Sequence, residues 1–184
     1  MAKWSSELSM GGKASMVLSL SADASLVADL VIVDIAPVSY DHDYSGYISA
    51  MRGIDFSAVS RRAEVEDALS SGVSDKGVRQ FLAQNVTTDK DSGAMSWQVN
   101  IDAMADHLGD IIGWPEDDLA ADQYDGDVLF ISGANSHYVD PKDRTHIKSL
   151  FPKAAFTSIK GAGHWVHAEK PDAVLLTLSA FLKR

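Results

Sequence analysis

The sequence predicts an α/β fold, with a mainly parallel β-sheet flanked by helices. Short, largely apolar segments resemble buried parallel strands, and these occupy residues 30–33, 128–131 and 155–159. Segments with the apolar spacing of amphipathic helices alternate with them, at residues 10–20, 141–151 and 171–182. Such alternation favours parallel pairing through right-handed crossovers. Residues 1–8 show no useful strand pattern, although a frayed strand there would extend the sheet.

Length and composition indicate about one globular domain. The 184 residues are 46% hydrophobic and 23% charged, and they include no cysteine, which excludes disulfide scaffolds and disordered tails. No apolar run is long enough to cross a bilayer, and no signal-peptide pattern is present, so we expect a cytoplasmic protein without a membrane partner. The net charge of −10 argues against nucleic acid as a partner.

Residues 40–122 differ from the rest of the chain. Four amphipathic helical patterns of two to three turns follow one another, at residues 44–51, 61–69, 76–84 and 101–112. Glycine and proline separate several of them, and only residues 95–99 hint at extended structure. We therefore expect core segments at residues 1–39 and 123–184, with a helical lid inserted at residues 40–122.

Three polar residues stand where the core segments turn from strand to helix. Ser9 precedes a helix, Asp34 ends the first apolar strand, and His164 follows the last strand. Ligands of open parallel sheets bind at the carboxyl ends of the strands. Acyl transfer needs a hydroxyl nucleophile, an imidazole base and a carboxylate that orients the base. The competing interpretation is structural: Ser9 as a helix N-cap and Asp34 as the start of a turn.

The motifs around these residues resemble those of α/β-hydrolase-fold serine esterases. They read SMGGK at residues 9–13, VDIAPV at residues 33–38 and GAGHWVHAEKP at residues 161–171. They are nearest to the small bacterial YbfF-like enzymes, which cleave short acyl esters and acyl-CoA thioesters. The resemblance extends from Leu8 to the C-terminus. It implies a truncated α/β-hydrolase fold, lacking the N-terminal half and carrying a helical lid insertion.

The resemblance also implies roles for individual residues. Ser9 matches the nucleophile, His164 the general base and Asp34 the acid. The backbone N–H of Met10 matches an oxyanion donor. We therefore expect a serine carboxylesterase that acts on small acyl esters, with thioesters as further candidates, through an acyl-enzyme and without cofactor or metal.

The loop after residues 128–131 bears on both acid and substrate. It holds no carboxylate before Asp140, which favours Asp34 as the acid. Ser136 and His137 of this loop, together with Trp165, are the candidate substrate-binding residues.

A second function of a different class competes with the esterase. The family motif has Gly-His before the nucleophile, where this chain has Glu7-Leu8. This departure from the motif and the strands that, by the resemblance, are missing both favour a catalytically impaired hydrolase remnant. Such a remnant would bind a small ligand or a protein. The bare sheet edge left by such a truncation also predicts a homodimer or other homo-oligomer.

Overall fold

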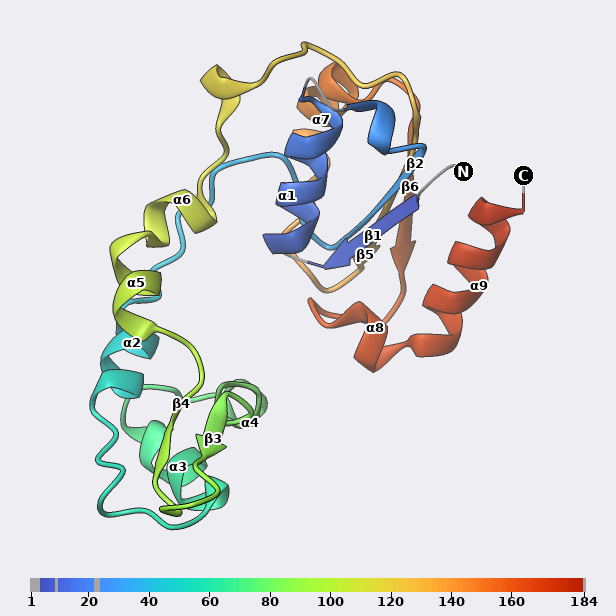
Figure 1. Cartoon of the computed structure of the whole chain (residues 1–184). Helices are drawn as coiled ribbons and strands as arrows, with labels where there is room; N and C mark the ends of the chain where they lie inside the picture. Colours follow the sequence, from blue (N-terminus) through green and yellow to red (C-terminus); the bar gives the residue numbers. More distant parts are fainter. Residues whose placement is uncertain (1–3, 9, 22–23, 184) are drawn as a thin grey trace. The chain divides into compact units, whose positions relative to one another are not determined.

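The computed structural model describes residues 4–8, 10–21 and 24–183, which fall into two compact units (Figure 1). The core unit comprises Met1–Tyr40 and Gly113–Arg184, and the second unit comprises Asp41–Ile112. The insertion expected at residues 40–122 therefore ends ten residues earlier. The cause is tertiary: Trp114 is buried in the core unit, and the N–H groups of Ala120 and Ala121 donate to the Leu20 carbonyl.

A four-stranded parallel sheet forms the centre of the core unit, as the alternating pattern predicts. Its order is β1 (Trp4–Leu8), β2 (Asp29–Val33), β5 (Asp127–Gly133) and β6 (Ala154–Ile159). Strand β1 lies in residues without a strand pattern, and it forms by pairing with the apolar β2. Because β1 is an edge strand, its pairing with a second copy stays a prediction that sedimentation velocity would check.

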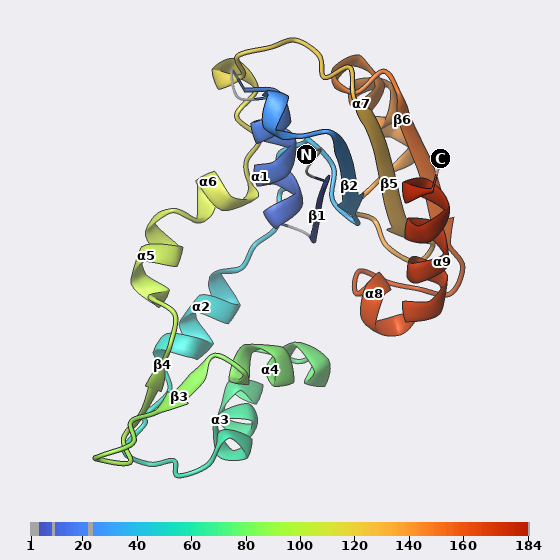
Figure 2. The ribbon, with the colours of Figure 1, turned by 45° about the vertical axis from the view of Figure 1, so that its right-hand side comes forward.

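Helices cover both faces of this sheet, as Figure 2 shows for α1 and α9. On one face, α1 (Met10–Ser19) and α7 (Arg144–Leu150) pack on a core that includes Met16, Phe130 and Ile147. On the other face, α8 (Val166–Glu169) and α9 (Pro171–Leu182) pack on a core that includes Ile131 and Phe181. The remaining short helices of the core unit are η1 (Ala24–Leu26), η3 (Glu116–Asp118) and η4 (Pro141–Asp143). Burial on both faces explains the apolar sequences of the inner strands.

The second unit is mainly helical and has its own hydrophobic core, which includes Met51, Val65 and Leu69. Its helices are α2 (Ser45–Arg52), α3 (Arg62–Ala68), η2 (Leu69–Ser71), α4 (Lys76–Ala83), α5 (Ile101–Asp106) and α6 (Leu108–Ile112). A small antiparallel hairpin pairs β3 (Val86–Thr88) with β4 (Met95–Trp97). Strand β4 falls in the segment that hinted at extended structure, whereas β3 had no such signal.

In the parts of the chain that the structure describes, no helix combines the length and apolar character needed to cross a bilayer.

Lys13 of α1 is buried, with 6% of its surface exposed. Its Nζ donates to the Gly113 carbonyl at 2.7 Å and lies 4.7 Å from the centroid of the Tyr40 ring. Burial disfavours the charged form and lowers the pKa of Lys13 from 10.5 to about 8.

Replacing this lysine gives a prediction about pH and stability. Between pH 8 and 10.5 the unfolded state binds more protons at Lys13 than the folded state, so the stability of the folded state rises with pH in that window. The quantity to follow is the difference between two free energies of unfolding, that of the unsubstituted protein minus that of Lys13→Met. We expect this difference to rise by on the order of 2 kcal/mol between pH 8 and pH 10.5 and to stay constant below pH 8. Urea titrations of both proteins from pH 6 to 10.5 check this; a difference independent of pH would contradict the burial of the charge.

Candidate active site

Asp34 follows β2 directly and is held in an uncommon backbone conformation. Its φ is +53°, in the left-handed region that Asp tolerates better than most residues. Its backbone N–H donates to the Ile131 carbonyl at 2.8 Å, and its side chain is fully buried. A conformation of this kind persists only where the surroundings impose it, and such residues cluster at functional sites.

Three hydrogen bonds satisfy the buried carboxylate of Asp34. Oδ1 accepts from the Gly133 N–H at 2.9 Å, and Oδ2 accepts from Ser136 Oγ at 2.5 Å and from His164 Nδ1 at 2.7 Å. An ionised carboxylate only accepts hydrogen bonds, so this contact with an ionised Asp34 requires a proton on His164 Nδ1. Its Nε2 is then free to act as the base when the ring is neutral, which is the arrangement that a triad requires.

The loop after β6 positions His164. Gly161 provides a positive φ of 71°, and the Asn135 N–H donates to the Ala162 carbonyl at 2.9 Å. The Gly163 N–H donates to Glu169 Oε2 at 2.9 Å, a contact that the sequence pattern did not indicate. The imidazole is 29% exposed, whereas the side chain of Asp34 behind it is fully buried.

Ser9 lies outside the described residues, but its neighbours in the chain are described. Strand β1 ends at Leu8 and helix α1 begins at Met10, which is the strand–helix context of a nucleophile elbow. Leu8 pairs in register with Val33, the residue before Asp34. Met10 is exposed at the N-terminal end of α1, where backbone N–H groups lack helical partners and favour negative charge.

The other candidates occupy different places. Asp140 accepts from the Lys142 N–H at 2.9 Å and caps η4, so the structure pairs His164 with Asp34 and not with Asp140. The Ser136 hydroxyl is engaged by Asp34. His137 and Trp165 are exposed in the same two strand-end loops. Substrate binding by Ser136, His137 or Trp165 stays a prediction.

Among the described side chains, no cluster of three His, Asp or Glu residues is placed to hold a metal ion.

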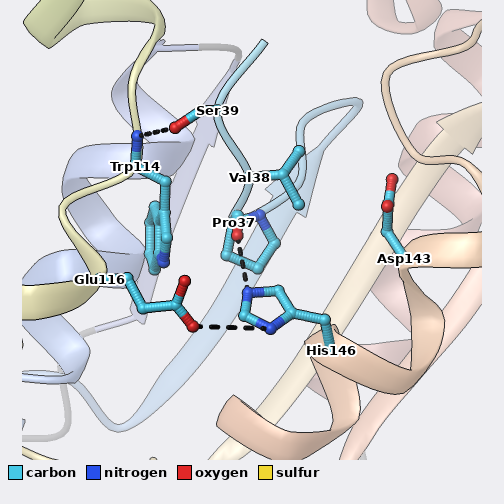
Figure 3. A pocket seen from close by; sticks show the side chains of 7 residues that line it. All are labelled: Pro37, Val38, Ser39, Trp114, Glu116, Asp143 and His146. Carbon is cyan, nitrogen blue, oxygen red and sulfur yellow. Dashed lines mark hydrogen bonds and ion pairs between the residues drawn. The ribbon is translucent and has the colours of Figure 1, made fainter.

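A separate cavity of about 400 Å³ lies beside the segment that follows Asp34 (Figure 3). Its lining consists of Pro37, Val38, Ser39, Trp114, Glu116, Asp143 and His146. His146 Nε2 lies 3.0 Å from the Pro37 carbonyl oxygen, and Ser39 Oγ accepts from the Trp114 N–H at 2.9 Å. These contacts tie residues 37–39 to Trp114 and to His146 of α7. Neither Asp34 nor His164 lines this cavity, so it is distinct from the site above.

The alpha/beta hydrolase fold family matches residues 8–171 of this chain. The chain belongs to the α/β-hydrolase fold family.

Relatives of this hydrolase-fold chain include lipases and esterases. It is 37% identical over 181 residues to the sn-1-specific diacylglycerol lipase ABHD11 of Danio rerio, which covers 95% of this chain and 55% of the relative. It is 35% identical over 175 residues to esterase YbfF of Escherichia coli K12, covering 95% of this chain and 65% of the relative. The chain thus spans a little over half to two thirds of the length of these relatives.

A solved structure described as a marine microorganism esterase is also similar, with a TM-score of 0.87 and 32% sequence identity. The similarity covers 95% of this chain and 67% of that one. The fold class expected from the sequence is therefore confirmed.

Proposed function

We propose that this hydrolase-fold chain is a serine carboxylesterase that hydrolyses small acyl esters, with small thioesters as further substrates. The observation that carries the proposal is the buried Asp34 carboxylate bonded to Nδ1 of the partly exposed His164. Membership of the family and the similarity to esterases and lipases support the reaction class.

In the proposed reaction, Ser9 Oγ attacks the carbonyl carbon of the ester while His164 Nε2 takes the hydroxyl proton. Asp34 holds the ring and stabilises the imidazolium. The Met10 N–H donates to the oxyanion. The tetrahedral intermediate collapses as His164 returns the proton to the leaving alcohol or thiol. Water then attacks the acyl-enzyme, with His164 again as the base, and releases the acid and Ser9.

We further propose that the unit Asp41–Ile112 acts as a lid. Its support is its place in the chain, inserted between the acid Asp34 and strand β5, together with its independent hydrophobic core. Loops and inserted units that follow the strand ends of α/β folds commonly shape the substrate site.

The competing proposal is a non-catalytic module that binds a small ligand or a protein. It draws on Glu7 and Leu8, which replace the Gly-His of the family motif. Turnover separates the two proposals because a binding module has none.

The test is hydrolysis of p-nitrophenyl acetate and butyrate and of acetyl-CoA by the full chain. We expect Ser9→Ala to lower kcat by a factor of at least about 10³. The exposed Ser158→Ala should retain full activity, as a matched control. Absence of turnover, or equal rates for Ser9→Ala and the unsubstituted chain, would overturn the esterase proposal.

A further inference from the structure

The phenol ring of Tyr138 stacks on the imidazole of His164. The two ring centroids are 4.0 Å apart and the planes are inclined by 24°. We propose that Tyr138 is a positioning residue that fixes the plane of the His164 ring, and therefore the direction of Nε2. The inference rests on the proposed function, since it assigns Tyr138 a role in presenting the general base.

Tyr138 is itself held rigidly. Its carbonyl accepts a 2.6 Å hydrogen bond from the Tyr40 hydroxyl, which in turn accepts from the Ala36 N–H at 2.8 Å. The rings of Tyr40 and Tyr138 also pack together, with centroids 5.2 Å apart. Both the backbone and the ring of Tyr138 are thus tied to the segment that follows Asp34.

The same short segment supports the acid. The Tyr138 N–H donates to Ser136 Oγ at 3.2 Å, and Ser136 donates to Asp34 Oδ2. Residues 136–138 therefore contact both members of the Asp34–His164 pair, the carboxylate through a hydroxyl and the imidazole through a ring face.

A hydrogen bond and a stacked ring constrain His164 in different ways. The bond to Asp34 fixes the position of Nδ1 but leaves the ring able to pivot about that atom. Stacking fixes the plane, so the two contacts together set where Nε2 points. Small misplacements of a catalytic group lower rates strongly. The negative face of the phenol also favours the imidazolium that forms during attack.

A contact to substrate is the alternative role for Tyr138, and it has a different kinetic signature. Loss of a substrate contact that is equally strong in the ground and transition states raises KM and leaves kcat unchanged. Loss of positioning lowers kcat and leaves KM nearly unchanged, because substrate binding does not depend on the direction of Nε2.

The experiment compares Tyr138→Leu, which removes the ring, with Tyr138→Phe, which keeps it. With p-nitrophenyl acetate we expect Tyr138→Leu to lower kcat by about tenfold to a hundredfold, with KM changed by less than about threefold. Tyr138→Phe should keep kcat within about threefold of that of the unsubstituted chain. If Tyr138→Leu does not fold, as judged by circular dichroism, Tyr138→Met replaces it.

A second readout does not depend on activity. NMR of the His164 ring protons, assigned by comparison with His164→Gln, should show an upfield ring-current shift that Tyr138→Phe keeps and Tyr138→Leu loses. If the unsubstituted chain is active and Tyr138→Leu loses the shift without a fall in kcat, the positioning role is overturned. A rise in KM alone in Tyr138→Leu would overturn it too. An unchanged shift in Tyr138→Leu would overturn the stacking itself. If the unsubstituted chain has no turnover and Tyr138→Leu still loses the shift, the stacking contact is confirmed. That result contradicts the proposed function and not the contact.

Discussion

Asp34→Asn is expected to lower the kcat for ester hydrolysis by about 10⁴ while the chain stays folded. Asn tolerates the left-handed conformation of residue 34, where φ is +53°. Its amide cannot balance the imidazolium charge, and its NH₂ group can select the wrong tautomer of His164. Steady-state kinetics with p-nitrophenyl acetate measure the loss, and circular dichroism checks the fold.

Asp140→Asn is the matched control. Asp140 lies in the loop after β5 and caps η4 through the Lys142 N–H, without a described bond to His164. We expect its kcat to stay within about threefold of the unsubstituted chain. A large loss for Asp140→Asn with none for Asp34→Asn would transfer the acid role to the later loop.

Gly133→Ala is expected to have the largest effect on stability. A Cβ on Gly133 would lie 2.1 Å from the Gly163 carbonyl oxygen and 2.6 Å from that of Ala162. Both are backbone atoms of the loop that carries His164, so relief of the clash must displace that loop. We expect a loss of about 3 kcal/mol or more in the free energy of unfolding, measured by urea denaturation.

Gly163→Ala, in the facing loop, separates this clash from a general intolerance of added methyl groups. Its Cβ would lie 3.1 Å from Glu169 Oε1, the far end of a flexible side chain that can move. We expect a change of about 1 kcal/mol or less. Equal stabilities for Gly133→Ala and Gly163→Ala would show that the two loops do not pack as closely as described.

The strands and the strand-end residues could be predicted because local sequence determines them. Strands β2 and β5 are apolar and rich in β-branched residues, since the sheet buries both faces. Carboxyl ends of parallel strands meet at one edge of a sheet. This rule placed Asp34 and His164 near each other in the sequence interpretation, and the structure brings their side chains into contact.

Other features depend on tertiary contacts that leave no periodic signal. Strand β1 forms on the ladder offered by β2, and residues 113–122 return to the core unit through the burial of Trp114. The contacts of Ser136 with Asp34 and of Tyr138 with His164 join residues 102 and 26 positions apart in the chain. No spacing rule for helices or strands links residues at such separations.

The central claim is that Ser9, activated by His164, is the nucleophile. A fluorophosphonate probe tests it most directly: the serine oxygen forms a bond to phosphorus, fluoride leaves, and His164 takes the proton. Intact mass and peptide mapping should show one adduct per chain, on Ser9, that is absent in Ser9→Ala and strongly slowed in His164→Ala. An unlabelled chain, or an adduct on another residue that persists in Ser9→Ala, would contradict the assignment.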